Sequence, residues 1–163
     1  MLSQLDENSS DIELEKIDLA LAATKVAHAL APKAEKQELE ITVLGSGELS
    51  ANHSQMSELF YNLMDNAVKY NRQGGAVAVE ISAVPNGAKI TVSDTGIGIP
   101  KEVQSRVFER FYRVDQSRSK KTGGTGLGLA IVKHIVMAYD GSIELQSGVD
   151  RGTRITVLLN NSG

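Results

Sequence analysis

Three short segments of this chain carry the side chains and the backbone that binding a magnesium nucleotide requires. They are Asn62–Tyr70 (NLMDNAVKY), Asp94–Pro100 (DTGIGIP) and Gly123–Ala130 (GGTGLGLA), all within ~70 residues. The first offers amide oxygens and a cation, and the second a carboxylate beside glycines. The third offers backbone N–H groups at the start of a helix. One segment alone would be weak evidence, but the three together predict ATP binding.

The first segment places its polar side chains on one stripe of a helix. Asn62, Asn66, Lys69 and Tyr70 fall at positions i, i+4, i+7 and i+8, which share a helix face. An amide oxygen is a hard, neutral ligand that suits Mg²⁺, and Lys69 can neutralise phosphate charge. The alternative for this segment taken alone is an ordinary solvated helix face.

Asp94 is expected to point inward at the end of a strand. Ile90 and Val92 mark the core-facing side of that strand, and Asp94 continues their alternation. A carboxylate left unpaired there costs several kcal/mol, and the exocyclic amine of adenine is a suitable partner. The alternative is a helix N-cap or a turn aspartate, but the next helix is expected only from residue 100 or 101, too far on for Asp94 to cap it.

The glycine-rich segment at residues 123–128 leads directly into a periodic helix. Its glycines let the backbone approach phosphates, and the helix start presents free N–H groups and a positive dipole end. It is not a Walker A loop, because no Gly-Lys-Ser/Thr follows, and its GxGxG spacing is not the dinucleotide fingerprint. A purely flexible hinge is the alternative.

Between these glycine segments lies Phe108–Asp115 (FERFYRVD), followed by a polar and basic run. We expect the aromatic residues to fix one end of a loop that closes as a lid, with basic side chains toward the triphosphate. The aromatic residues are Phe108, Phe111 and Tyr112, and the basic residues are Arg110, Arg113, Arg118, Lys120 and Lys121. For the last three, a solvated charged loop is the competing interpretation.

The elements that must position these segments alternate between helices and strands. Helices are predicted over 19–36, 54–71 and 127–139, and strands over 39–44, 76–84, 88–94, 142–146 and 153–159. A short edge strand is predicted at 17–19, and Gly141 is expected to end the last helix in a left-handed conformation. The order favours an α+β fold: a two-layer α/β sandwich with a mixed, mostly antiparallel sheet and helices packed on one face.

Composition limits the class of protein. The 163 residues fit one domain, and with 41% hydrophobic but only 4% aromatic residues the core must be aliphatic. A net charge of −3 argues against nucleic-acid binding. The absence of cysteine excludes disulfides and favours a cytoplasmic setting. No segment reaches the ~20 apolar residues of a membrane span, and the domain is expected to be soluble.

The motifs resemble those of the catalytic and ATP-binding domain of bacterial two-component sensor histidine kinases, which have the GHKL-type fold of gyrase-like and chaperone-like ATPases. NLMDNAVKY resembles the N box, DTGIGIP the G1 box, FERFYR the F box and GGTGLGLAIVKHIV the G2 box. The resemblance covers residues 14–160. Residues 1–13 would then be a linker, the remnant of the connection to a missing dimerisation domain.

The resemblance also implies roles for individual residues. Asn66 would bind Mg²⁺, and Asp94 would accept the adenine amine. The residues implied in catalysis are Asn62, Lys69, Arg110 and Arg113. Those implied in nucleotide binding are Asn62, Asn66, Lys69, Tyr70, Asp94, Gly96, Gly98, Ile99, Gly123, Gly124, Thr125, Gly126, Leu127, Gly128 and Thr153.

One part of the family pattern is missing. The phosphoacceptor histidine of such kinases lies in a His-Glu/Asp-x-x-Thr/Asn-Pro motif on a dimerisation domain, and His28–Pro32 (HALAP) is one residue short and lacks the acid. We therefore expect a domain that binds ATP and transfers the γ-phosphoryl group to a histidine on a separate domain. The implied partners are that domain and a response regulator, and the implied parent is an inner-membrane sensor. The domain itself is expected to be monomeric.

Two other classes of protein remain as alternatives. Gyrase-type ATPases place a glutamate four residues before the magnesium asparagine as general base, whereas this chain has Asn62 there. An asparagine cannot take a proton, which favours phosphoryl transfer over hydrolysis. A non-catalytic nucleotide-sensing module is the second alternative.

Overall fold

The computed structural model describes residues 13–101, 104, 108 and 128–161, and every structural statement below refers to these residues. The helices are α2 (Leu19–Lys36), α3 (His53–Lys69) and α5 (Gly128–Ala138). The strands are β1 (Glu15–Asp18), β2 (Glu40–Gly45), β3 (Glu48–Ala51), β4 (Ala76–Val84), β5 (Gly87–Asp94), β6 (Ser142–Gly148) and β7 (Gly152–Asn160).

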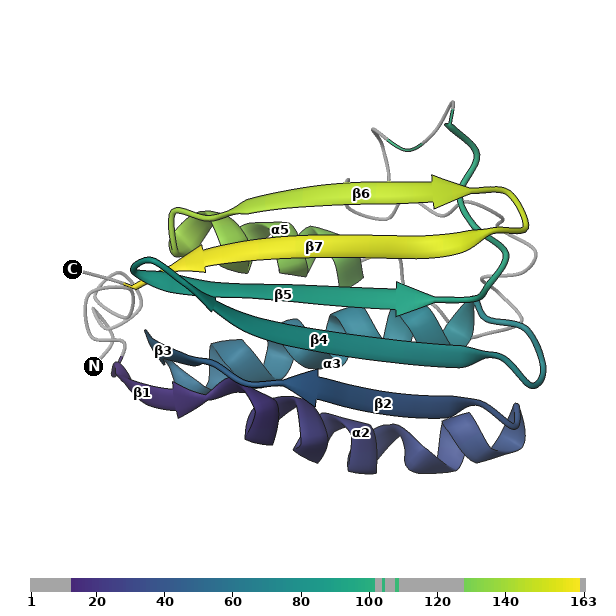
Figure 1. Cartoon of the computed structure of the whole chain (residues 1–163), viewed down its shortest axis with the longest axis horizontal. Helices are drawn as coiled ribbons and strands as arrows, with labels where there is room; N and C mark the ends of the chain where they lie inside the picture. Colours follow the sequence, from purple (N-terminus) through teal and green to yellow (C-terminus); the bar gives the residue numbers. More distant parts are fainter. Residues whose placement is uncertain (1–12, 102–103, 105–107, 109–127, 162–163) are drawn as a thin grey trace, which may run out of the picture.

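The molecule has two layers, one of strands and one of helices (Figure 1). The main sheet has the order β2-β4-β5-β7-β6, and α2, α3 and α5 lie behind it. Strands β2 and β4 run parallel and the other neighbours are antiparallel. The predicted two-layer sandwich with a mixed, mostly antiparallel sheet is therefore confirmed.

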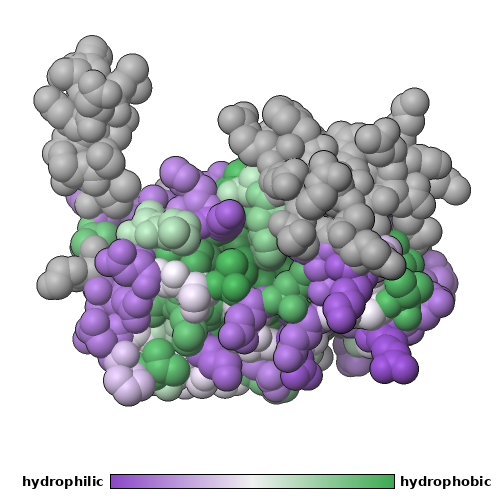
Figure 2. Space-filling view, turned by 90° about the horizontal axis from the view of Figure 1, so that it is seen from above, coloured by the Kyte–Doolittle hydropathy of each residue, from purple (hydrophilic) through white to green (hydrophobic). Residues whose placement is uncertain are grey.

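The core fills the space between these layers and is aliphatic, as the composition predicted. Strand β4 alternates, so that Val77, Val79 and Ile81 are buried while the residues between them are more exposed. The central helix α3 buries Phe60 and Leu63 against the sheet. The alternation along the strands fixes which side chains face the helices and which face solvent. Figure 2 shows the molecule of Figure 1 from above, where hydrophobic surface lies between hydrophilic side chains.

The two longer helices begin at polar caps. Asp18 accepts a hydrogen bond from the backbone N–H of Leu21 at 3.2 Å, and Asn52 accepts one from Gln55 at 3.0 Å. Each cap satisfies a backbone donor that the helix itself leaves unpaired. Helix α2 continues through Pro32 to Lys36, so the predicted bounds of this helix are confirmed despite the proline.

Two expectations about local structure need correction. The left-handed residue after α5 is Asp140, with φ of 52°, and not Gly141. Gly141 is needed for space instead, because a Cβ atom there would lie 1.9 Å from the carbonyl oxygen of Leu158. The second difference is β3, which was not predicted and pairs with β1 as a separate two-stranded sheet.

Candidate nucleotide-binding site

The described parts of the first two motifs meet at one end of the molecule. The C-terminal end of α3 and the end of β5 are on the right in Figure 1, and α5 has its start on the side that faces this end. Helix α3 runs toward that end, β4 runs away from it, and β5 returns. The antiparallel β4–β5 pair thus brings Asp94, 24 residues beyond Tyr70 in the sequence, back to the end of the helix.

The asparagine stripe of α3 faces the start of α5. The side-chain amide of Asn62 donates to the carbonyl oxygen of Glu58 at 2.7 Å. Its Oδ1 lies 3.3 Å from where a Cβ on Gly128 would be. Asn66 is half-buried on the same stripe, and no hydrogen bond to its side chain is found within the described ranges. The amide oxygen of Asn62, beside the start of α5, and the amide oxygen of Asn66 are thus available for a ligand.

Lys69, predicted to contact phosphate, forms an ion pair in this structure. Its Nζ lies 3.0 Å from Oδ2 of Asp65, one turn earlier on α3. The other oxygen of Asp65 lies 3.1 Å from Nζ of Lys33 on α2. Asp65 was not singled out from the sequence. Its position in the asparagine segment, four residues before Lys69, was the signal that could have identified this ion pair.

Asp94 is half-buried at the end of β5, on the strand position that the sequence predicted. Burial raises the pKa of its carboxyl group to about 6, and hydrogen bonds from the backbone N–H groups of Gly96 and Thr153 limit the rise. The bond from Gly96 measures 2.8 Å. The Asp94 side chain therefore stabilises the turn that follows it, which is the role of a turn aspartate considered in the sequence analysis. Even so, the raised pKa shows that these bonds do not offset the loss of solvation of the charged form.

The glycine loop after Asp94 is joined to the end of α3. The backbone N–H of Ile97 donates to the carbonyl oxygen of Tyr70 at 3.1 Å. A Cβ atom on Gly96 would lie 2.2 Å from that same oxygen, so the close approach requires glycine. The segments that begin with Asn62 and with Asp94 are therefore in direct backbone contact.

A buried asparagine strengthens this junction. The amide oxygen of Asn71 accepts from the hydroxyl of Thr95 at 3.0 Å, and its amide nitrogen donates to the carbonyl oxygen of Ala76 at 3.0 Å. The hydroxyl of Thr95 in turn accepts from the backbone N–H of Ala76 at 2.9 Å. One side chain thus connects the end of α3, the start of β4 and the glycine loop.

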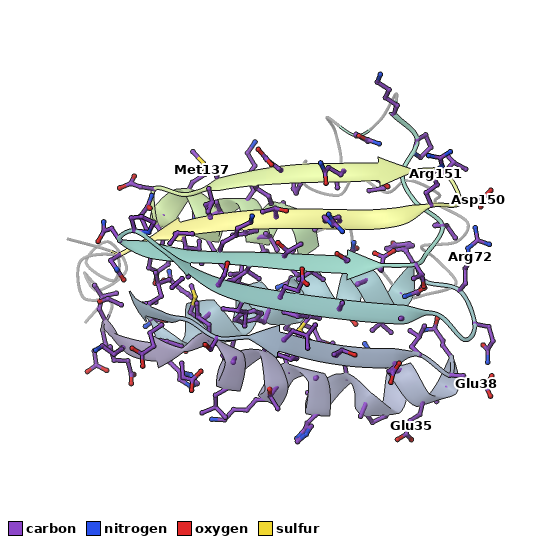
Figure 3. All side chains as sticks on the ribbon, viewed as in Figure 1. Glu35, Glu38, Arg72, Met137, Asp150 and Arg151 are labelled. Atoms are coloured by element: carbon purple, nitrogen blue, oxygen red, sulfur yellow. The ribbon has the colours of Figure 1, made fainter. Side chains whose placement is uncertain are left out.

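The β6–β7 hairpin holds the other side of the loop. The hydroxyl of Ser147 accepts from the backbone N–H of Ile99 at 2.7 Å. Gly98 has φ of 75°, and a Cβ there would lie 1.9 Å from the carbonyl oxygen of Gly148. Arg72 and Asp150 form an ion pair between the segment after α3 and this hairpin, and both are labelled at that end of the molecule in Figure 3.

The remaining site residues divide between the described and the undescribed parts of the chain. Gly128 begins α5, and Phe108 packs against the core, as predicted for the aromatic anchor. Thr153 lies opposite Asp94 in the β5–β7 register, and its hydroxyl is 2.8 Å from that of Ser147. The predicted residues Arg110, Arg113, Gly123, Gly124, Thr125, Gly126 and Leu127 lie outside the described residues.

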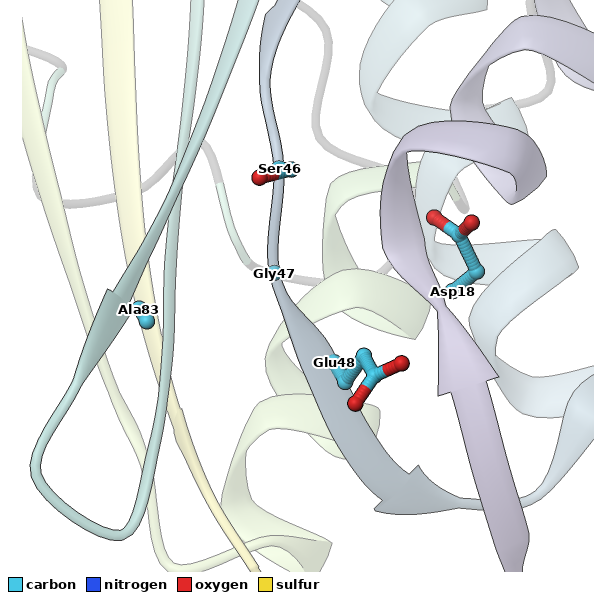
Figure 4. Close-up of a pocket in the computed structure, with 5 residues that line it drawn as sticks. All are labelled: Asp18, Ser46, Gly47, Glu48 and Ala83. Atoms are coloured by element: carbon cyan, nitrogen blue, oxygen red, sulfur yellow. The ribbon is translucent and has the colours of Figure 1, made fainter.

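A surface pocket elsewhere contains none of the predicted site residues. It is lined by Asp18, Ser46, Gly47, Glu48 and Ala83 (Figure 4). Its acidic groups have structural partners, because Asp18 caps α2 and Glu48 pairs with Lys16. We assign this pocket no chemistry.

Comparison with known proteins decides the family. The family described as histidine kinase-, DNA gyrase B-, and HSP90-like ATPase matches residues 51–162. The chain belongs to this family. The fold relationship that the four motifs indicated is thereby confirmed.

Individual relatives agree with this assignment. Sensor histidine kinase RppB of Synechocystis is 47% identical over 118 residues, which are 71% of this chain and 26% of RppB. The mycobacterial sensor histidine kinase MprB has a TM-score of 0.78 at 27% identity, covering 90% of this chain and 97% of that structure. Full-length ShkA in complex with AMPPNP has a TM-score of 0.78 at 25% identity, covering 93% of this chain and 32% of that one. The chain thus spans about a quarter of RppB.

Within the described ranges, no helix has the length and apolarity needed to cross a membrane. The same ranges contain no group of three or more His, Asp or Glu side chains that could hold a metal ion.

Proposed function

We propose that this domain binds ATP with Mg²⁺ and transfers the γ-phosphoryl group to a histidine on a separate dimerisation domain in two-component signalling. The observation that carries the proposal is the half-buried carboxylate of Asp94, whose pKa is raised to about 6, beside a glycine loop in backbone contact with the asparagine helix. A fold that keeps such a group at the mouth of a site, at a cost in stability, points to a ligand that pairs with it.

The adenine base is assigned to the Asp94 end of the site. The carboxylate keeps lone pairs beyond those that accept from Gly96 and Thr153, and a free lone pair can accept from the exocyclic amine of adenine. Gly96 places backbone without a side chain next to it, since a Cβ atom there would lie 2.9 Å from Oδ1 of Asp94. The glycine loop would therefore receive the flat face of the base.

The phosphates and Mg²⁺ are assigned to the space between α3 and the start of α5. The amide oxygens of Asn66 and Asn62 fit a hard cation that keeps phosphate and water ligands, and Lys69 supplies positive charge one turn beyond Asn66. Bound there, Mg²⁺ would neutralise charge on the β- and γ-phosphates. The free N–H groups of α5 favour an anion at the same place.

Transfer is favoured over hydrolysis because the described site lacks a base for water. The position four residues before Asn66 is Asn62, whose amide nitrogen donates to Glu58. An amide has no useful basicity, so it cannot activate a water molecule. An imidazole nitrogen of a substrate histidine is itself a nucleophile and needs no such base.

We further propose that residues 14–160 form the catalytic domain and that residues 1–13 form a linker. Within this linker the structure describes residue 13. The parent protein is proposed to be an inner-membrane sensor that places this domain in the cytoplasm, with a response regulator as the next phosphoryl acceptor. The curated relatives are sensor kinases such as RppB and the WalK protein of Bacillus subtilis.

Calorimetry with ATP, with and without Mg²⁺, tests binding. Labelled ATP and an added histidine-bearing dimerisation domain from a related sensor kinase test transfer. The expected result is Mg²⁺-dependent binding and label on the added histidine. Asp94→Asn should weaken binding, whereas the matched change Asp140→Asn, at an exposed position after α5, should not. Binding without transfer to any tested domain would favour the nucleotide-sensing alternative.

A further inference from the structure

Three charged side chains connect α2 to the proposed phosphate site. Asp65 of α3 lies between Lys33 of α2, at 3.1 Å, and Lys69 of α3, at 3.0 Å. The side chain of Asp65 is 10% exposed, that of Lys69 is 22% exposed, and that of Lys33 is 51% exposed. We call Lys33, Asp65 and Lys69 the α2–α3 charge cluster.

The geometry of the cluster decides how much charge Lys69 can offer a ligand. Asp65 and Lys69 alone would form a neutral pair, because one carboxylate would hold one ammonium group. Lys33 occupies the other carboxylate oxygen, which gives the cluster a net charge of +1. The hydrogen bond to Asp65 is also the main reason that the pKa of Lys33 is raised.

Anchoring also limits where the Lys69 side chain goes. A lysine side chain carries about 2 kcal/mol of rotamer entropy, and its ammonium group has three donors. One donor is used by Asp65, so two remain while the long side chain is held beside Asp65. Lys69 is thereby positioned before any ligand arrives.

We propose that Asp65 is a positioning residue for Lys69 and that Lys33, on a helix outside all the nucleotide motifs, sets the affinity for the triphosphate through Asp65. This inference rests on the proposed function, since it assigns Lys69 to phosphate. Lys33 binds no nucleotide itself. It pairs with Asp65, so that Lys69 keeps its charge available to the ligand.

The expected size of the effect follows from elementary electrostatics. Changing one unit charge ~10 Å from a trianionic ligand changes affinity roughly fivefold at ~10 mM salt and about twofold at ~0.1 M salt. Removing Lys33 should weaken ATP binding by at least this factor, because the cluster goes from net +1 to net zero and Lys69 is left alone with Asp65.

The experiment measures ATP and adenosine affinity at low salt for four single variants and one double variant. Lys33→Met should weaken ATP binding more than about fivefold and leave adenosine binding unchanged, because adenosine carries no phosphate. Lys33→Arg should restore ATP affinity, because it keeps the charge. Lys25→Met is the matched control: it removes the same charge from an exposed position two turns earlier on α2 and should change ATP affinity less than twofold.

The fourth variant, Asp65→Asn, tests whether Lys33 acts through Asp65. In that background Lys33→Met should weaken ATP binding by about fivefold or less, a smaller loss than in the wild-type background, because the through-space loss of one unit charge remains but no carboxylate is left to hold Lys69. An equal loss in both backgrounds, a loss equal to that of Lys25→Met, or an equal loss of adenosine binding would overturn the inference and leave the proposed function standing. Failure of the wild-type protein to bind ATP would overturn both.

Discussion

Acidification from pH 8 to pH 5 should weaken ATP binding through a single carboxylate, that of Asp94. Its pKa in the free domain is raised to about 6, chiefly by burial. Only the ionised form has a lone pair free for the adenine amine and, at the same time, the charge that strengthens this hydrogen bond. Protonation therefore competes with nucleotide binding.

The magnitude follows from the pKa. With a group of pKa about 6, about 99% of the free domain is ionised at pH 8 but only about 9% at pH 5, so the apparent Kd should rise about tenfold, or ~1.4 kcal/mol. The midpoint of the change should lie near pH 6 in the wild-type protein.

The same group should act on stability in the opposite direction. The folded-state pKa lies above the reference value of 3.8, so this contribution to stability is fully present below about pH 4 and is lost as the pH rises through about 6. The difference corresponds to at most ~3 kcal/mol. Asp94→Asn should therefore leave the nucleotide-free domain at least as stable as the wild type at pH 8, while it weakens ATP binding.

Calorimetric titrations at several pH values, on the wild type and on Asp94→Asn, separate the protein from the ligand. The variant reports the titration of the nucleotide phosphates and of all other groups, and the difference between the two profiles reports Asp94. Parallel profiles would refute the assignment of adenine to Asp94. A variant that melts several degrees lower without ligand and still binds ATP normally would show that the carboxylate serves the turn alone.

Three further outcomes are expected. GTP should bind at least ~10-fold more weakly than ATP in calorimetry, because the O6 atom of guanine presents lone pairs to the carboxylate of Asp94; equal affinities would contradict this. Asn66→Ala should abolish phosphoryl transfer to an added dimerisation domain while changing the free energy of unfolding by less than ~1 kcal/mol, because its side chain has no hydrogen bond among the described residues; transfer near the wild-type rate would remove it from the magnesium site. Asn71→Ala should cost ~1–3 kcal/mol in chemical denaturation, because it leaves the backbone N–H of Arg72 and the hydroxyl of Thr95 without their acceptor; an unchanged midpoint would show that water replaces the amide.

Periodicity predicted the elements of this fold well because most of them are long and amphipathic. The bounds of α2 and β4 agree with the sequence prediction. Helix α2 buries residues three or four apart, and β4 buries every second residue from Val77 to Ile81. Strand β3 was missed because its four residues pair with β1, about thirty residues earlier, and nothing local marks such a pairing.

The candidate site was predicted in part, and the misses have physical reasons. Asp94 was placed correctly because strand parity alone directs its side chain. The ion pair between Asp65 and Lys33 joins two helices, and a pattern read along one helix does not show its neighbour. Gly141 was assigned to a left-handed turn because glycine often serves there, yet Asp140 adopts that conformation and the glycine avoids a collision with β7.

The position of β7 in the sheet sets the order in which a newly made chain can become functional. It follows β6 in the sequence, yet it lies between β5 and β6 and supplies the backbone N–H of Thr153 to Asp94. A nascent chain that has reached Gly141 already contains Asn66, Asp94 and Gly128 but has no strand beside β5 on that side. Synthesis of β7 is thus the step that completes the proposed adenine end of the site, and a chain released before it would carry every motif without the strand that holds Asp94.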